Sequence, residues 1–167
     1  MTDPGNPTQA QPEPRPFDAS SVRPAAGYAG DITPQQAWDL LAGEPGAVLV
    51  DVRTEGEWRT IGVPDAASLG KDVVFTQWVH ADGRPNPAFL EELKSGVGES
   101  TGPVVFLCRS GQRSIGAARL ATSAGIAPSY NVLEGFEGPA GPDGVRNHNG
   151  WKVRELPWKG IIDEAGA

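Results

Sequence analysis

Two continuously apolar segments constrain the fold of this chain more than any other feature of its sequence. AVLVDVR (residues 47–53) and PVVFLC (residues 103–108) show no alternation of polar and apolar residues before their last positions. Strands that are buried on both faces have this pattern, because helices cover both sides of a parallel sheet. SYNVL (residues 129–133) and a weaker segment at residues 72–79 are further candidate strands.

Helical segments separate these candidate strands. In ITPQQAWDLLAG, Thr33 is a suitable N-cap and Pro34 suits the first helical position. NPAFLEELKSGVG has the same organisation with Asn86 as its cap, and RSIGAARLATSAG (residues 113–125) follows the second apolar segment. The alternation predicts an α/β fold with a central, mostly parallel sheet that helices flank on both faces.

Composition limits both the domain organisation and the kinds of partner. The chain of 167 residues is long enough for one domain, which we place at residues 30–160. Residues 1–29 are rich in proline and predict a disordered tail, and residues 161–167 a short C-terminal tail. The net charge of −7 argues against nucleic-acid binding or binding to anionic membranes.

The cysteine content and the lack of long apolar runs bear on location. One cysteine cannot form an internal disulfide or a cysteine-based zinc site, so we expect a reducing compartment and no bound metal. The N-terminus has no apolar core of a secretory signal, and no apolar run approaches the ~20 residues of a membrane span. The sequence therefore predicts a cytoplasmic protein.

The segment whose residues are most suited to catalysis is CRSGQRS, which joins the second apolar strand to the helix that follows. Cys108 lies at the end of this strand, where α/β sheets bind their ligands. The helix N-terminus, the loop amides and the guanidinium groups of Arg109 and Arg113 all favour a thiolate there. Gly111 allows the loop its unusual backbone angles. An isolated cysteine is often a small buried hydrophobic residue, but the polar turn makes that alternative a poor fit here.

Two motifs resemble the rhodanese family. CRSGQRS is similar to the active-site loop of rhodanese domains, and VLVDVRTEGEW…GVPDAASL is similar to the second signature of that family. NVLEGFEG, followed by GWK and LPW, matches the end of many bacterial single-domain members, so the resemblance covers about residues 30–160. One departure is that Gly62 and Val63 stand where many members have a glycine–histidine pair.

The resemblance implies a sulfurtransferase that works through a persulfide on Cys108. The sulfur would come from a small anionic donor such as thiosulfate, or from a persulfide, and would pass to a thiol, cyanide or a protein acceptor. No metal or organic cofactor is implied. The loop residues that would bind the donor are Arg109, Ser110, Gly111, Gln112, Arg113 and Ser114.

Two other functions stay open. Cysteine-based phosphatases and arsenate reductases are the first, but they place five residues between cysteine and arginine, whereas four separate Cys108 from Arg113. The second is a non-catalytic module that binds sulfur or a partner, which the presence of Cys108 disfavours.

Further residues are candidates for supporting the site. Asp51, Arg53 and Glu57 follow the first apolar strand, and they either line the pocket or form a charge network that holds the loop. We favour the network, because unlike charges at a strand end commonly satisfy each other. Candidates for the rim of the pocket are Trp58, Trp78 and Phe136.

Overall fold

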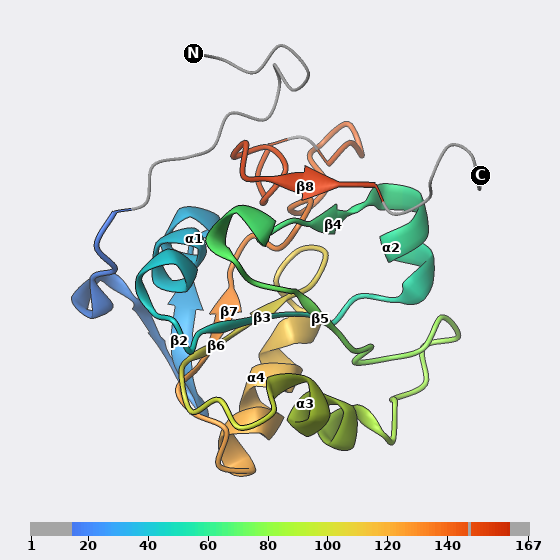
Figure 1. Ribbon diagram of the computed structural model, residues 1–167. Helices are drawn as coiled ribbons and strands as arrows, with labels where there is room; N and C mark the ends of the chain where they lie inside the picture. Colours follow the sequence, from blue (N-terminus) through green and yellow to red (C-terminus); the bar gives the residue numbers. More distant parts are fainter. Residues whose placement is uncertain (1–14, 147, 161–167) are drawn as a thin grey trace.

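A six-stranded sheet forms the centre of the molecule (Figure 1). The computed structural model describes residues 15–146 and 148–160. The strand order is β1–β2–β7–β6–β3–β5, and every neighbouring pair except β1–β2 is parallel. The strands are β1 (Arg23–Ala25), β2 (Tyr28–Ile32), β3 (Val48–Asp51), β5 (Val74–Phe75), β6 (Val104–Leu107) and β7 (Ser129–Val132).

Helices cover both faces of this sheet, as the sequence predicts. Helices α3 (Phe89–Val97) and α4 (Arg113–Ser123) lie on one face. The other face carries α1 (Pro34–Gly43) and a small antiparallel pair made of β4 (Val63–Pro64) and β8 (Trp158–Lys159). The remaining elements are α2 (Glu55–Ile61) and two short 3₁₀ turns, Ala19–Ser21 and Ala67–Leu69. The predicted α/β class is confirmed.

The continuous apolar character of the central strands has a direct structural reason. Leu49 and Val105 point into the core layer under α1, whereas Val50 and Phe106 point into the layer under α3 and α4. Successive residues of a strand face opposite sides of the sheet, and both sides are covered here. Both sets of alternating residues in β3 and β6 are therefore apolar, and each set packs into one of the two layers of the core.

Ordered structure starts earlier than the predicted boundary at residue 30. The first fourteen residues of the predicted tail lie outside the described residues, as do residues 161–167. The segment from residue 15, however, contains β1 and the start of β2. Pro24 is compatible with β1 because this is an edge strand, whose open side needs no backbone donor. The proline content of residues 15–29 therefore does not prevent folding.

Two other segments differ in detail from the predicted elements. The strand expected at residues 72–79 is reduced to β5, and α3 begins at Phe89 rather than directly after Asn86. The Asn86 side chain instead accepts a hydrogen bond from the Ala88 amide in the preceding turn. Within the described residues, no helix has the length and apolar character that a membrane span requires.

Candidate functional site

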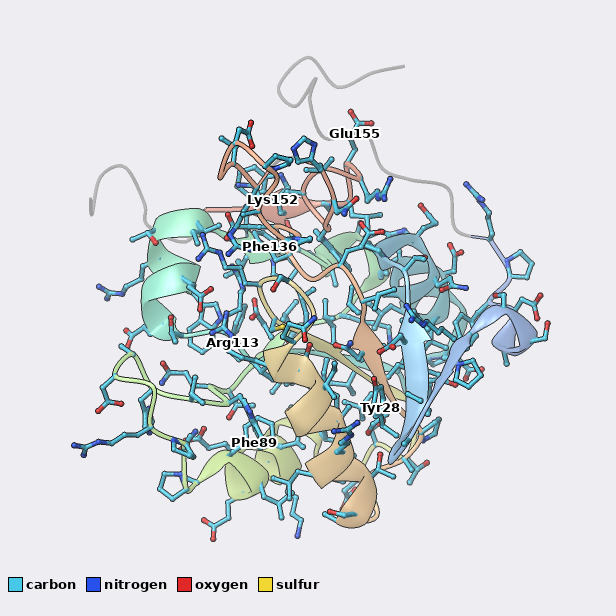
Figure 2. All side chains as sticks on the ribbon, turned by 180° about the vertical axis from the view of Figure 1, so that it is seen from behind. Tyr28, Phe89, Arg113, Phe136, Lys152 and Glu155 are labelled. Carbon is cyan, nitrogen blue, oxygen red and sulfur yellow. The ribbon has the colours of Figure 1, made fainter. Side chains whose placement is uncertain are left out.

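Cys108 is the first residue after β6, at the edge where the parallel strands end. The chain turns through residues 109–112 and enters α4 at Arg113. Figure 2 shows Arg113 near the start of α4, at the same end of the molecule as Phe136 and Lys152. This is the edge at which α/β sheets present their ligand sites, so the topology places the cysteine as the sequence predicts.

The Cys108 sulfur lies inside the loop, within hydrogen-bond distance of a backbone amide and a serine hydroxyl. Cys108 is only 1 % exposed. The Gly111 amide donates to Sγ at 3.1 Å, and the Ser114 hydroxyl lies 3.1 Å from the same sulfur. Donors aimed at a buried sulfur stabilise it when it carries negative charge. Two donors are therefore placed where they would stabilise a negative charge on this sulfur.

Glycine is required where this loop meets the segment that follows β7. Gly111 has φ +92°, and a Cβ at this position would collide with the Leu133 carbonyl. On the other side, the Phe136 amide donates to the Cys108 carbonyl at 2.8 Å, and the Glu137 amide donates to the Arg109 carbonyl at 3.0 Å. The loop is thus held between its own helix and residues 133–137.

Both loop arginines form ion pairs with carboxylates. Arg113 makes two hydrogen bonds to Glu57 of α2, at 2.7 and 2.9 Å. Arg109 donates from Nε to Glu137 at 2.8 Å. These carboxylates reduce the positive charge that the sequence alone assigns to the loop. Contact of the two arginines with a donor stays a prediction.

Glu57 has two structural roles. Its carboxylate and backbone form a capping box with Thr54, which starts α2, and the same carboxylate binds Arg113. Burial on its own would raise the pKa of Glu57. The hydrogen bonds from Arg113 and Thr54, together with the Arg113 charge, outweigh burial and lower the pKa from 4.5 to about 2. The same pairing raises the pKa of Arg113.

We expect Glu57→Gln to remove stability at neutral pH but not near pH 2. The pKa of Glu57 is lower in the folded state, so its ion pair stabilises the fold fully above pH 4.5 and is lost as the pH falls towards about 2. The loss at pH 7 should be on the order of 1–2 kcal/mol. Thermal unfolding of the wild type and of Glu57→Gln across this pH range measures the loss of stability. Glu99→Gln, at an exposed position, is the control, and an equal loss in both variants would contradict the assignment.

Asp51 and Arg53 form a buried ion pair, which is linked to the loop through Phe136. Both side chains are fully buried, and Arg53 Nη2 lies 2.7 Å from Asp51 Oδ2 and also donates to the Gly62 carbonyl. The Arg53 guanidinium packs over the Phe136 ring, 4.1 Å from its centroid. This is the charge network that the sequence favours for these two residues. Glu57 does not join it, because Arg113 binds Glu57.

The remaining predicted site residues take different positions. Gln112 is exposed at the N-cap of α4 and Ser110 is half-buried in the loop. Trp58 is half-buried and packs edge-on against Phe75. Trp78 is also half-buried but packs against Phe89 of α3. Phe136 is fully buried against Arg53, and its amide binds the Cys108 carbonyl, so it supports the loop and is not part of an exposed rim.

Sequence reasoning missed two residues that contact the loop. Glu137 binds Arg109, and Asn131 of β7 accepts a hydrogen bond from Ser114. Asn131 carries a signal that could have revealed it, because it is a polar residue inside an otherwise buried strand. Among the described residues, no group of three or more histidine, cysteine or acidic side chains is arranged to hold a metal ion.

Comparison with known proteins identifies the family. The family model described as "STR4 middle domain" matches residues 29–162. The chain belongs to this family. Relatives named as rhodanese-like or as a sulfurtransferase support the rhodanese-like superfamily for this chain. One of them is Rhodanese-like domain-containing protein 4 of Arabidopsis thaliana, a chloroplastic protein. It is 26% identical over 125 residues, which make up 74% of this chain and 24% of the plant protein.

Bacterial relatives of this STR4-type domain match it over most of their length. Uncharacterized protein RC0915 of Rickettsia conorii is 36% identical over 130 residues, covering 77% of this chain and 96% of that protein. Thiosulfate sulfurtransferase GlpE of Pseudomonas syringae is 32% identical over 106 residues, covering 64% of this chain and 82% of GlpE.

Solved structures share the fold. The crystal structure of Rv0390 from M. tuberculosis is 57% identical, with a TM-score of 0.75 over 79% of this chain and 98% of that one. The polysulfide-sulfur transferase homodimer of Wolinella succinogenes is 23% identical, with a TM-score of 0.53 over 80% of each chain, and this likeness shows the fold alone.

Proposed function

We propose that this protein is a sulfurtransferase that carries sulfur as a persulfide on Cys108. The observation that carries the proposal is the pair of hydrogen-bond donors, the Gly111 amide and the Ser114 hydroxyl, on a buried sulfur at the start of α4. Membership of the rhodanese-like superfamily and similarity to a protein named as a thiosulfate sulfurtransferase add support.

The reaction takes two displacements at sulfur. The Cys108 thiolate attacks the outer sulfur of thiosulfate, a new S–S bond forms, and sulfite leaves with the electron pair of the bond that breaks. An acceptor nucleophile then attacks the outer sulfur of the persulfide and the Cys108 thiolate leaves. No external oxidant or reductant is consumed, and covalent catalysis of this kind replaces one difficult step by two easier ones.

The loop has a clear task in both steps. The Gly111 amide and the Ser114 hydroxyl stabilise the anionic sulfur before attack and again when it leaves. The ion pairs with Glu57 and Glu137 hold Arg113 and Arg109 at the two ends of the loop. Hydrogen bonds from residues 136 and 137 keep the loop closed around the sulfur.

Intact mass spectrometry after incubation with thiosulfate tests the proposal. We expect the mass to rise by one sulfur atom and to return when cyanide is added. Peptide mapping should place the extra sulfur on the peptide that contains Cys108, the one cysteine of the chain. A persulfide donor should give the same product if thiosulfate is not the donor in the cell.

The same experiment separates the other two functions. A protein that takes up no sulfur from either donor but hydrolyses an aryl phosphate would be a phosphatase-type enzyme. A protein that takes up sulfur but releases it to no acceptor would be a sulfur-binding module. Either result would overturn the proposed catalysis.

The proposal includes the type of partner and a location. The donor is a small sulfur anion or a persulfide, and the acceptor is a thiol, cyanide or a protein. A single cysteine that carries sulfur suits a reducing compartment, so we propose a cytoplasmic location.

A further inference from the structure

A buried hydrogen-bond chain leads away from the Cys108 sulfur towards β7 and β2. The Ser114 hydroxyl contacts both Cys108 Sγ and the side-chain oxygen of Asn131. Asn131 lies on β7, paired in register with Asp31 of β2, and the Asn131 nitrogen donates to the Asp31 carboxylate at 2.9 Å. Ser114 and Asn131 are both fully buried. Beyond Cys108 itself, only Ser114 of these residues has a role in the steps proposed above, and Asn131 and Asp31 have none.

The contacts of Asn131 leave its amide only one orientation. Its nitrogen faces the Asp31 carboxylate and the Gly111 carbonyl, at 2.9 and 3.1 Å. Neither of these groups has a hydrogen to donate, so both require the amide NH₂ on their side. The Asn131 oxygen therefore faces Ser114 and can only accept.

The Ser114 hydroxyl has one hydrogen but two acceptors. When Cys108 is a thiol, the S–H group donates to the Ser114 oxygen, and the serine hydrogen is free for Asn131. When Cys108 is a thiolate, the serine hydrogen must turn to the sulfur, and the buried Asn131 oxygen loses its donor. An unsatisfied buried acceptor is unfavourable, so the thiolate form has a cost at Asn131 that the thiol form does not have.

We propose that Asn131 is a positioning residue that restrains the reactivity of Cys108 by competing with its sulfur for the Ser114 hydrogen. The inference rests on the proposed role of Cys108 as the nucleophile. Its test needs no sulfur donor, so its failure and a failure of sulfur transfer can be told apart.

The charged groups around this chain come from several elements. Three ion pairs surround the loop, namely Arg113–Glu57, Arg109–Glu137 and Arg53–Asp51. Beyond Asn131 lie Asp31 and Tyr28, whose hydroxyl donates to the Asp31 carboxylate at 2.7 Å. Substitution of Asn131 leaves all these groups in place but removes one donor from Asp31. A less shielded Asp31 charge would disfavour the thiolate, which is the opposite of the effect we expect.

Ultraviolet absorbance of the thiolate as a function of pH tests the proposal, because the chain has one cysteine and the signal belongs to that sulfur alone. In Asn131→Ala we expect the midpoint of the Cys108 titration to fall by about 0.5 to 1 pH unit, the size expected for one net hydrogen bond. Asn131→Leu, which fills the space, should shift it in the same direction if the alanine variant folds poorly. Ser129→Ala removes another buried hydroxyl of β7, bound to the Ile126 carbonyl, and should leave the midpoint unchanged.

The double variant decides whether the effect passes through Ser114. In a Ser114→Ala background, Asn131→Ala should no longer lower the midpoint, because the hydrogen for which the two groups compete is gone. A merely structural role for Asn131 as the anchor of Gly111 predicts another result: loss of the anchor loosens the Gly111 donor and raises the midpoint. A raised or unchanged midpoint, or an equal fall with and without Ser114, would overturn the proposal.

Discussion

Cys108→Ser is expected to abolish sulfur loading and to lower sulfur transfer on the order of 10³-fold or more. A serine oxygen is a much weaker nucleophile than a thiolate near neutral pH and cannot form a persulfide. The fold should persist, because serine is close to cysteine in size and the Gly111 amide and Ser114 hydroxyl would satisfy its oxygen. Steady-state transfer from thiosulfate to cyanide, with intact mass after loading, measures both effects.

A stability measurement is the control for this variant. The thermal unfolding temperature of Cys108→Ser should stay close to that of the wild type. A loss of activity in this variant would then not result from unfolding. Because the chain has no other cysteine, residual loading of the variant with sulfur would contradict a persulfide on Cys108. Unchanged turnover without loading would point to a mechanism that does not use this sulfur.

The sequence predicts the central fold well for a specific physical reason. Strands β3 and β6 are buried on both faces, so their apolar pattern identifies both the strands and the parallel sheet. The N-terminal boundary was harder to predict, because β1 is a short edge strand that contains Pro24. Such a strand depends on its pairing with β2 and not on a local pattern of its own.

The site shows the same division between local and long-range information. The Cys108 loop is contiguous in sequence, so its turn, its glycine and its helix start can all be predicted from CRSGQRS. The partners of its arginines cannot, because Glu57 and Glu137 are far from the loop in sequence and meet it only through the fold. Asn131 is similar: its neighbours Ser114 and Asp31 come from α4 and β2.

Asp51→Ala should destabilise the protein by about 3–5 kcal/mol and impair sulfur loading as well. The substitution leaves the Arg53 guanidinium fully buried without its carboxylate. A buried charge without a partner is strongly unfavourable. Arg53 also packs against Phe136, whose amide donates to the Cys108 carbonyl, so a shift of Arg53 would disturb the loop. Urea unfolding and the mass assay measure the two effects.

The exposed pair of Glu55 and Arg59 is the matched control. The Glu55 and Arg59 side chains are 65% and 62% exposed, so Glu55→Ala should lower the stability by no more than about 1 kcal/mol. Replacing both buried partners, as in Asp51→Leu with Arg53→Met, removes the unpaired charge and should be less destabilising than Asp51→Ala alone. If Asp51→Ala cost no more than Glu55→Ala, or if the double variant were the least stable, burial of the Arg53 charge would not explain the role of Asp51.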